Sequence, residues 1–145
     1  MLQGGRNRWR GMVYGMTVRH PWTTETVRRN PRPVWRIWDE FGIASAPIKG
    51  YWEKDCPVKT SNPGIQAAIY QKGDQSLISV ASWCDKPVRL LFQIDWKNLG
   101  TEQDKTVLVT PGIKDFQKEN IFNPGDSISI EPMKGWLLYL RKKSN

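Results

Sequence analysis

The chain has 145 residues, a length typical of one domain and sufficient to bury a hydrophobic core without a metal or disulfide link. Its hydrophobic content of 39%, with eight tryptophans, indicates a globular chain and excludes a disordered one. No apolar run approaches the ~18 residues of a membrane-spanning helix, so we expect no membrane partner. Met1 is also not followed by the apolar segment of a secretory signal peptide.

The net charge of +8 is concentrated at the N-terminus. Residues 1–36 contain eight arginines and one acidic residue, Glu25, whereas the rest of the chain is nearly balanced, with 14 basic and 13 acidic side chains. A basic segment can bind phosphate backbones. Here, however, the arginines alternate with aromatic residues and prolines and form no polycationic run. Nucleic-acid binding is therefore a weaker alternative.

Residues 33–42, PVWRIWDEFG, are expected to form one helix. Pro33 suits the first helical position and Gly42 suits the position after the last turn. The apolar residues fall on one helical stripe: Val34, Trp35, Ile37, Trp38 and Phe41. Asp39 and Glu40 diverge by about 100° on a helix, so they cannot act on one bond as a catalytic pair. The pattern favours a helix that docks through its rings.

After residue 60 the sequence predicts strands separated by turns. The expected strands are 65–70, 77–83, 88–95, 106–110, 127–131 and 135–141. In 88–95 apolar and polar residues alternate, with Leu91 as the one apolar residue on the polar side. Residues 96–100 fit a single helical turn ended by Gly100. We therefore expect a mainly β fold, an antiparallel β-sandwich of about seven strands with one N-terminal helix, and we place the last strand inside a sheet.

Residue types that commonly form catalytic and metal sites are scarce in this sequence. His20 is the only histidine, and Cys56 and Cys84, the only cysteines, lack zinc-site spacing. The cysteines form either one disulfide or two free buried thiols. Carboxylates are scattered and fall mostly in turns. We also interpret Asp115 as a turn residue by default. We expect no catalytic residue, no metal and no cofactor in this chain.

The eight tryptophans are the feature that most needs an explanation. Rings bury large apolar areas and also stack on sugar faces. Trp35, Trp38, Trp83 and Trp136 fall in the expected helix and strands and are assigned to the core. The candidate carbohydrate or domain-interface contacts lie in turns or irregular segments: Trp9, Trp22, Tyr51, Trp52 and Trp96. Tyr51–Trp52 is the best candidate for a stacking platform.

Five segments carry a resemblance to a known family: GMVYGMTVRHPW, PVWRIWDEFGI, KGYWEKDCPVKT, LISVASWCDKPVRLLFQIDWKNLG and PGDSISIEPMKGWLLYL. Together they resemble the C-terminal end of large bacterial glycoside hydrolases similar to family 123, in which a β-sandwich follows a (β/α)8 catalytic barrel. The later half also resembles the β-domains that follow the barrels of α-amylase-like and α-galactosidase-like enzymes.

The resemblance implies a division of the chain and a role for it. Residues 1–45 would be an irregular Arg/Trp-rich segment with the docking helix, the end of a catalytic domain, and 46–145 the C-terminal β-sandwich domain. The implied function is non-catalytic: the domain stabilises the upstream barrel of the same parent chain and also contacts glycan. The implied location is extracellular or periplasmic. The alternatives are a carbohydrate-binding module that acts through exposed Trp and Tyr rings and, less favoured, a basic nucleic-acid-binding domain.

Overall fold

The computed structural model describes residues 7–15 and 32–144, and the structural statements below concern these residues. Three α-helices are present: α1 (Arg8–Val13), α2 (Arg32–Phe41) and α3 (Trp96–Leu99), with short 3-10 turns at η2 (Ile43–Ser45) and η3 (Gln103–Lys105). The strands of the described residues are β1 (Ile48–Gly50), β2 (Val58–Thr60), β3 (Ile65–Lys72), β4 (Gln75–Ser82), β5 (Val88–Leu90), β6 (Phe92–Ile94), β7 (Thr106–Thr110), β8 (Asn120–Phe122), β9 (Ile128–Ile130) and β10 (Gly135–Lys142). No described helix has the length and apolar character needed to cross a membrane.

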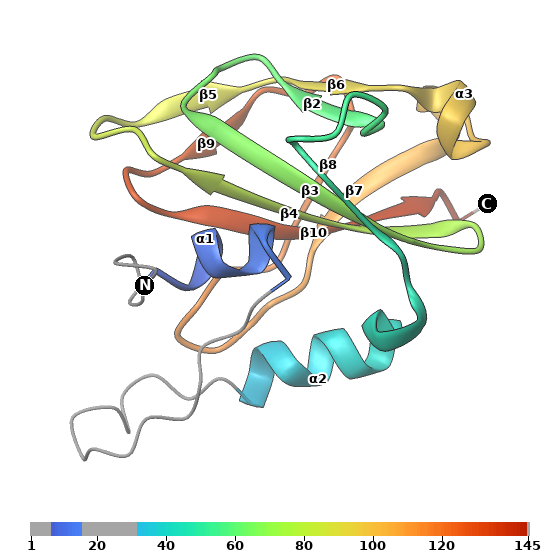
Figure 1. Ribbon diagram of the computed structural model, residues 1–145, viewed down its shortest axis with the longest axis horizontal. Coiled ribbons are helices and arrows are strands. Elements are labelled where there is room, and N and C mark those ends of the chain that lie inside the picture. The colour runs from blue at the N-terminus through green and yellow to red at the C-terminus, as the bar shows by residue number, and fades with distance from the viewer. Residues whose placement is uncertain (1–6, 16–31, 145) are drawn as a thin grey trace.

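The strands form an antiparallel sandwich, as the sequence predicts. A six-stranded sheet in the order β1-β3-β4-β10-β7-β8 lies at the centre of the molecule. The pairs β2–β6 and β5–β9 cover one face of this sheet, and helices α1 and α2 lie on the other face (Figure 1). Strand β10 pairs with β4 on one side and β7 on the other, which confirms that the last strand runs inside a sheet.

The expected strand 88–95 is wrong as one continuous element. β5 pairs with β9, whereas β6 pairs with β2, and the chain changes partner at Leu91. Leu91 bonds to Ser61 in two ways. The Leu91 carbonyl accepts from the Ser61 N–H at 3.0 Å, and the Leu91 N–H donates to Ser61 Oγ at 3.0 Å. β1, β2 and β8 were not predicted, because strands of three residues carry too little periodicity to be recognised.

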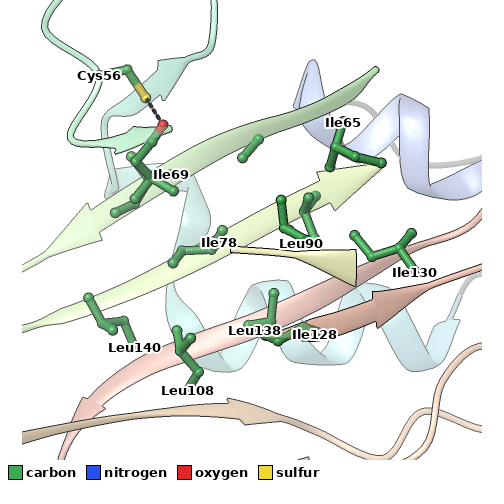
Figure 2. Packing of buried hydrophobic residues seen from close by; sticks show 13 residues of the cluster. Cys56, Ile65, Ile69, Ile78, Leu90, Leu108, Ile128, Ile130, Leu138 and Leu140 are labelled. Carbon is green, nitrogen blue, oxygen red and sulfur yellow. Dashed lines mark hydrogen bonds between the residues drawn. The ribbon is translucent and has the colours of Figure 1, made fainter. Parts of the chain in front are cut away.

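The central sheet is apolar on both faces. On the face toward the short strands, Ile69, Ile78 and Leu138 lie side by side across β3, β4 and β10, and each is fully buried in the main core (Figure 2). On the opposite face the adjacent register positions place Tyr70 beside Leu77 and Leu77 beside Tyr139. This second face is covered by the helices.

Helix α2 docks on that second face through its rings. Val34, Trp38 and Phe41 are buried, with Trp38 at 6.1 Å from the Tyr70 ring and Phe41 at 6.2 Å from the Tyr139 ring. The carboxylates that follow Trp38 in sequence are solvent-exposed. Gly42 ends the helix with a φ of 78°, a conformation that glycine adopts without strain. The prediction of a docking helix is confirmed.

Helix α1 covers the same face and was not predicted, because residues 1–45 outside 33–42 were expected to be irregular. Asn7 is its N-cap: the side chain accepts from the Arg10 N–H at 3.1 Å. Met12 and Val13 are fully buried on the sheet, and the Tyr70 hydroxyl donates to the Met12 carbonyl at 3.3 Å. A six-residue helix is marginal alone, so this packing is what stabilises it.

Two further expectations about the core are settled by burial. Trp83 was assigned to the core, which is wrong: it is 38% exposed, and the guanidinium of Arg10 lies over its ring, 4.8 Å from the centroid. Cys56 and Cys84 are free thiols, so the disulfide alternative is not observed. The Cys56 thiol is buried and donates to the Val58 carbonyl at 3.3 Å, and burial raises its pKa.

Gly135 is a position where the sheet tolerates no side chain. A Cβ atom there would lie 1.8 Å from the Val80 carbonyl oxygen, so the Gly135→Ala variant forces β10 away from β4. We expect its free energy of unfolding to fall by about 3 kcal/mol, the upper end of overpacking costs. Gly112→Ala is the control, because its Cβ would meet the Glu119 Cβ at an ordinary 3.5 Å. Urea unfolding measures both, and equal stability of the two variants would contradict the expectation.

Alkaline pH tests the contact between β3 and the helices. Burial raises the pKa of Tyr70 to about 12, above the value near 10 in an unfolded chain. Between these values the unfolded state loses the phenolic proton first, so stability is present below pH ~10 and falls as the pH rises toward 12. We expect Tyr70→Phe to reduce this alkaline loss by about 3 kcal/mol in urea unfolding series. An unchanged alkaline slope would contradict it. Burial also raises the pKa of Tyr139. Tyr139 therefore contributes equally to the alkaline loss of stability in the unmodified protein and in the Tyr70→Phe variant.

Candidate functional site

Helix α1 gathers aromatic side chains that are far apart in the sequence. Trp9 stacks on Phe116, with ring centroids 4.7 Å apart and an interplanar angle of 16°. One residue later, Arg10 lies over Trp83. Tyr14, just after the helix, contacts the rings that follow β1. Two surface features result, one around the Tyr14 contact and one around the Trp9–Phe116 contact.

The first feature is a cluster of three rings, Tyr14, Tyr51 and Trp52, which we call the ring cluster. Tyr14 stacks on Trp52 at 5.7 Å and 11°, and Tyr51 meets Trp52 edge-on at 5.3 Å and 79°. The Tyr14 and Tyr51 hydroxyls share a hydrogen bond of 2.8 Å, which is the main cause of the raised pKa of Tyr14. Trp52 remains 52% exposed and Tyr14 41%. The rings are therefore fixed relative to one another and still accessible.

Gly50 supports Trp52 from below. A Cβ at Gly50 would lie 2.2 to 2.3 Å from three consecutive atoms of the Trp52 six-membered ring, which places that ring directly over the glycine. The Trp52 ring thus contacts both Gly50 and Tyr14. These contacts leave less of the ring free to stack on a sugar than the sequence suggested, but they hold its exposed part rigidly.

The second feature is a groove of about 530 Å³ beside the first half of β10. Its aromatic lining comes from Trp9 of α1, Phe116 of the β7–β8 loop and Trp136 of β10, all half-buried. Its polar lining consists of Asp115, Gln117, Lys118, Ser129, Glu131 and Lys134. The groove lies where β7 no longer pairs with β10, because β7 contacts only residues 139–142 of that strand.

The Gln117 side chain replaces the strand pairing that β10 lacks at this point. Its side-chain Oε1 accepts from the Leu137 N–H at 2.8 Å, and its Nε2 donates to the Leu137 carbonyl at 2.9 Å and the Pro111 carbonyl at 2.8 Å. The amide therefore acts as a peptide group beside β10 and fixes the loop that carries Phe116. A bridge between Ile113 and Gln117 closes the same loop.

The predicted contact residues do not form one site. Trp9 lies in the groove, and Tyr51 and Trp52 lie in the ring cluster. Trp96 lies in α3, half-buried against the main core. Trp22 lies outside the described residues.

Three residues that contribute to these features were not among the predicted contacts. Trp136 was assigned to the core, and it does pack against the main core while it also lines the groove. Tyr14 and Phe116 were not singled out. The GMVYG stretch, which ends at Gly15 with its φ of 73°, was the only local signal for Tyr14. Phe116 carried none.

The described residues hold no group of three or more His, Cys, Asp or Glu side chains in an arrangement that could bind a metal ion. Asp39 and Glu40 are exposed on the side of α2 away from its buried rings. What the two surface features provide is rings, hydroxyls and charged side chains, which suits binding.

Removing the Gln117 amide should destabilise the groove. In Gln117→Leu the N–H of Leu137, a fully buried residue, loses its partner, and an unsatisfied buried donor costs about 1–3 kcal/mol. We expect a loss of this size in urea unfolding, together with faster amide hydrogen exchange at Leu137. Gln66→Leu is the control, because the Gln66 amide bonds only to the Pro63 carbonyl in an exposed turn. Unchanged exchange at Leu137 would contradict the assignment.

Comparison with known proteins identifies the family of this fold. The family described as "Glycoside hydrolase 123, C-terminal domain" matches residues 30–141, a span that begins just before α2 and ends within β10. A search of curated proteins finds no match. Because the matched span covers most of the 145 residues, the chain belongs to the family of glycoside hydrolase 123 C-terminal domains.

Proposed function

We propose that this chain is a non-catalytic accessory domain that packs on the catalytic barrel of its parent glycoside hydrolase and stabilises it. Family membership supports the setting, because a C-terminal domain of a glycoside hydrolase implies a catalytic domain in the same parent protein. As part of the same proposal, and from the family resemblance alone, we place the parent outside the cytosol, in the periplasm or the extracellular space.

The ring cluster is the observation that carries the docking proposal. Grouped aromatic side chains at a surface mark interaction sites, and Trp and Tyr are the residues that most often dominate interface energies. Tyr14, Tyr51 and Trp52 are already fixed by mutual stacking, by a hydrogen bond and by Gly50. A partner therefore has little side-chain entropy to remove when it packs on them.

The position of the ring cluster also favours the catalytic domain as the partner. Tyr14 follows α1, which precedes the matched residues 30–141, while Tyr51 and Trp52 lie within them. The cluster thus joins the chain segment nearest the expected catalytic domain to the sandwich itself. The arginines of residues 1–36 belong to the same part of the sequence.

Carbohydrate binding is the second candidate function. The groove favours it, because rings and polar side chains line a concave surface of about 530 Å³, within the size range of small-molecule sites. In this role the domain contacts glycan while the catalytic domain performs hydrolysis.

Heat inactivation of the full-length parent enzyme tests the docking role. We expect Trp52→Ala to shorten the half-life of activity at elevated temperature and to weaken the domain contact by about 2 kcal/mol, as for a buried interface tryptophan. Gly50→Ala should have the same direction, because it displaces the Trp52 ring without removing it. Ile121→Ala is the matched control: Ile121 is 66% exposed and lies in β8, at the other edge of the sheet from β1.

Melting of the 145-residue chain alone shows whether a variant damages the domain itself. Trp52→Ala should change that melting temperature little, because Trp52 is half exposed. Equal heat inactivation of the Trp52→Ala and Ile121→Ala parents would contradict docking at the ring cluster.

A further inference from the structure

We propose that the groove beside β10 is a binding site for an uncharged oligosaccharide. This inference rests on the carbohydrate-binding role above and names its location and ligand class. It is independent of docking, because the groove and the ring cluster share no residue.

The lining offers the two kinds of contact that a sugar requires. A pyranose ring presents C–H groups on its faces, which pack on aromatic rings, and hydroxyls on its edges, which donate and accept hydrogen bonds. The groove supplies the rings of Trp9, Phe116 and Trp136. The Glu131 carboxylate accepts from hydroxyls and the Lys134 ammonium donates to them.

The charges of the groove select a neutral ligand. Among the described lining residues, two side chains are acidic, Asp115 and Glu131, and two are basic, Lys118 and Lys134, so their formal charges balance. A phosphate chain or nucleic acid requires a positive surface. In the part of the chain that the structure describes, the side chains of Lys118, Glu131 and Lys134 make no ion pair or hydrogen bond with protein, so they remain available to hydroxyls.

The groove is also organised before any ligand arrives. Trp136 Nε1 donates to the Ser129 carbonyl at 3.0 Å and its ring meets Phe122 edge-on at 6.3 Å, so its orientation is fixed. Gln117 holds the loop of Phe116 on β10. Such preorganisation lowers the entropic cost of binding.

Backbone conformation singles out the same two loops. Asp115 and Met133 have φ values of 58° and 62°, and they are the non-glycine residues with positive φ in the described chain. Asp115 lines the groove from the β7–β8 loop, and Met133 immediately precedes the lining residue Lys134. Non-glycine residues in this region cost about 1–3 kcal/mol and cluster at ligand sites.

The size of the groove suits a small ligand. Its volume of about 530 Å³ lies within the range of small-molecule sites and accommodates a few sugar units. A docked catalytic domain at the ring cluster leaves the groove as a separate surface.

Titration of the 145-residue chain with defined tetrasaccharides tests the proposal. The probes are cellotetraose, chitotetraose and xylotetraose, with anionic tetragalacturonate for comparison, and calorimetry measures the affinity. We expect at least one neutral probe to bind at millimolar or lower concentration and tetragalacturonate to bind more weakly. Trp136→Ala should weaken binding of that probe about tenfold, equivalent to ~1.4 kcal/mol.

Two exposed positions keep the test valid if Trp136→Ala unfolds. Glu131→Gln and Lys134→Met alter only side chains at the groove rim, and each should weaken binding several-fold without a change in melting temperature. Leu91→Ala is the control, because Leu91 is exposed and does not line the groove, and it should bind as the unmodified chain does. Absence of binding by all three neutral probes overturns the proposal, and so does binding that the Glu131 and Lys134 variants leave unchanged or stronger binding of tetragalacturonate. Each of these results leaves the docking proposal standing.

Discussion

The two apolar faces of the central sheet are the constraint on which this structure depends. β3, β4 and β10 place Ile69, Ile78 and Leu138 on one face and residues such as Leu77 and Tyr139 on the other. A sheet that is apolar on both sides must be covered on both sides, because exposed apolar area is costly at roughly 25 cal/mol per Å². The short strand pairs supply one cover, and the two N-terminal helices supply the other.

The helical cover also creates the functional surfaces. Met12 and Val13 bind α1 to the sheet, and that attachment directs Trp9 toward Phe116 and Tyr14 toward Trp52. The ring cluster and the groove each include a residue on or next to α1. The stability of the fold and the geometry of both candidate sites therefore depend on the same contacts. The Tyr70 hydroxyl, bonded to the Met12 carbonyl, is one of them.

The two surfaces suit two different partners within one accessory role. The ring cluster is apolar, rigid and exposed, which fits the face of another domain. The groove is mixed, with balanced charge and three rings, which fits a small polar ligand with apolar faces. A C-terminal domain of a glycoside hydrolase with both surfaces would hold the catalytic domain and keep glycan near it. The alternative of nucleic-acid binding stays a prediction, because four of the eight arginines of residues 1–36 lie outside the described residues.

The sequence by itself determined the local elements with strong periodicity: the docking helix α2, the long strands, the interior position of β10 and the antiparallel sandwich. It also pointed to Trp9, Tyr51 and Trp52 as surface rings. Only the tertiary structure decided the change of partner at Leu91, the existence of α1, the exposure of Trp83 and the assembly of the groove. The physical reason is that periodicity reports which face of an element is buried, whereas a six-residue helix, a three-residue strand and the Gln117 contact to β10 are stabilised by residues distant in the chain.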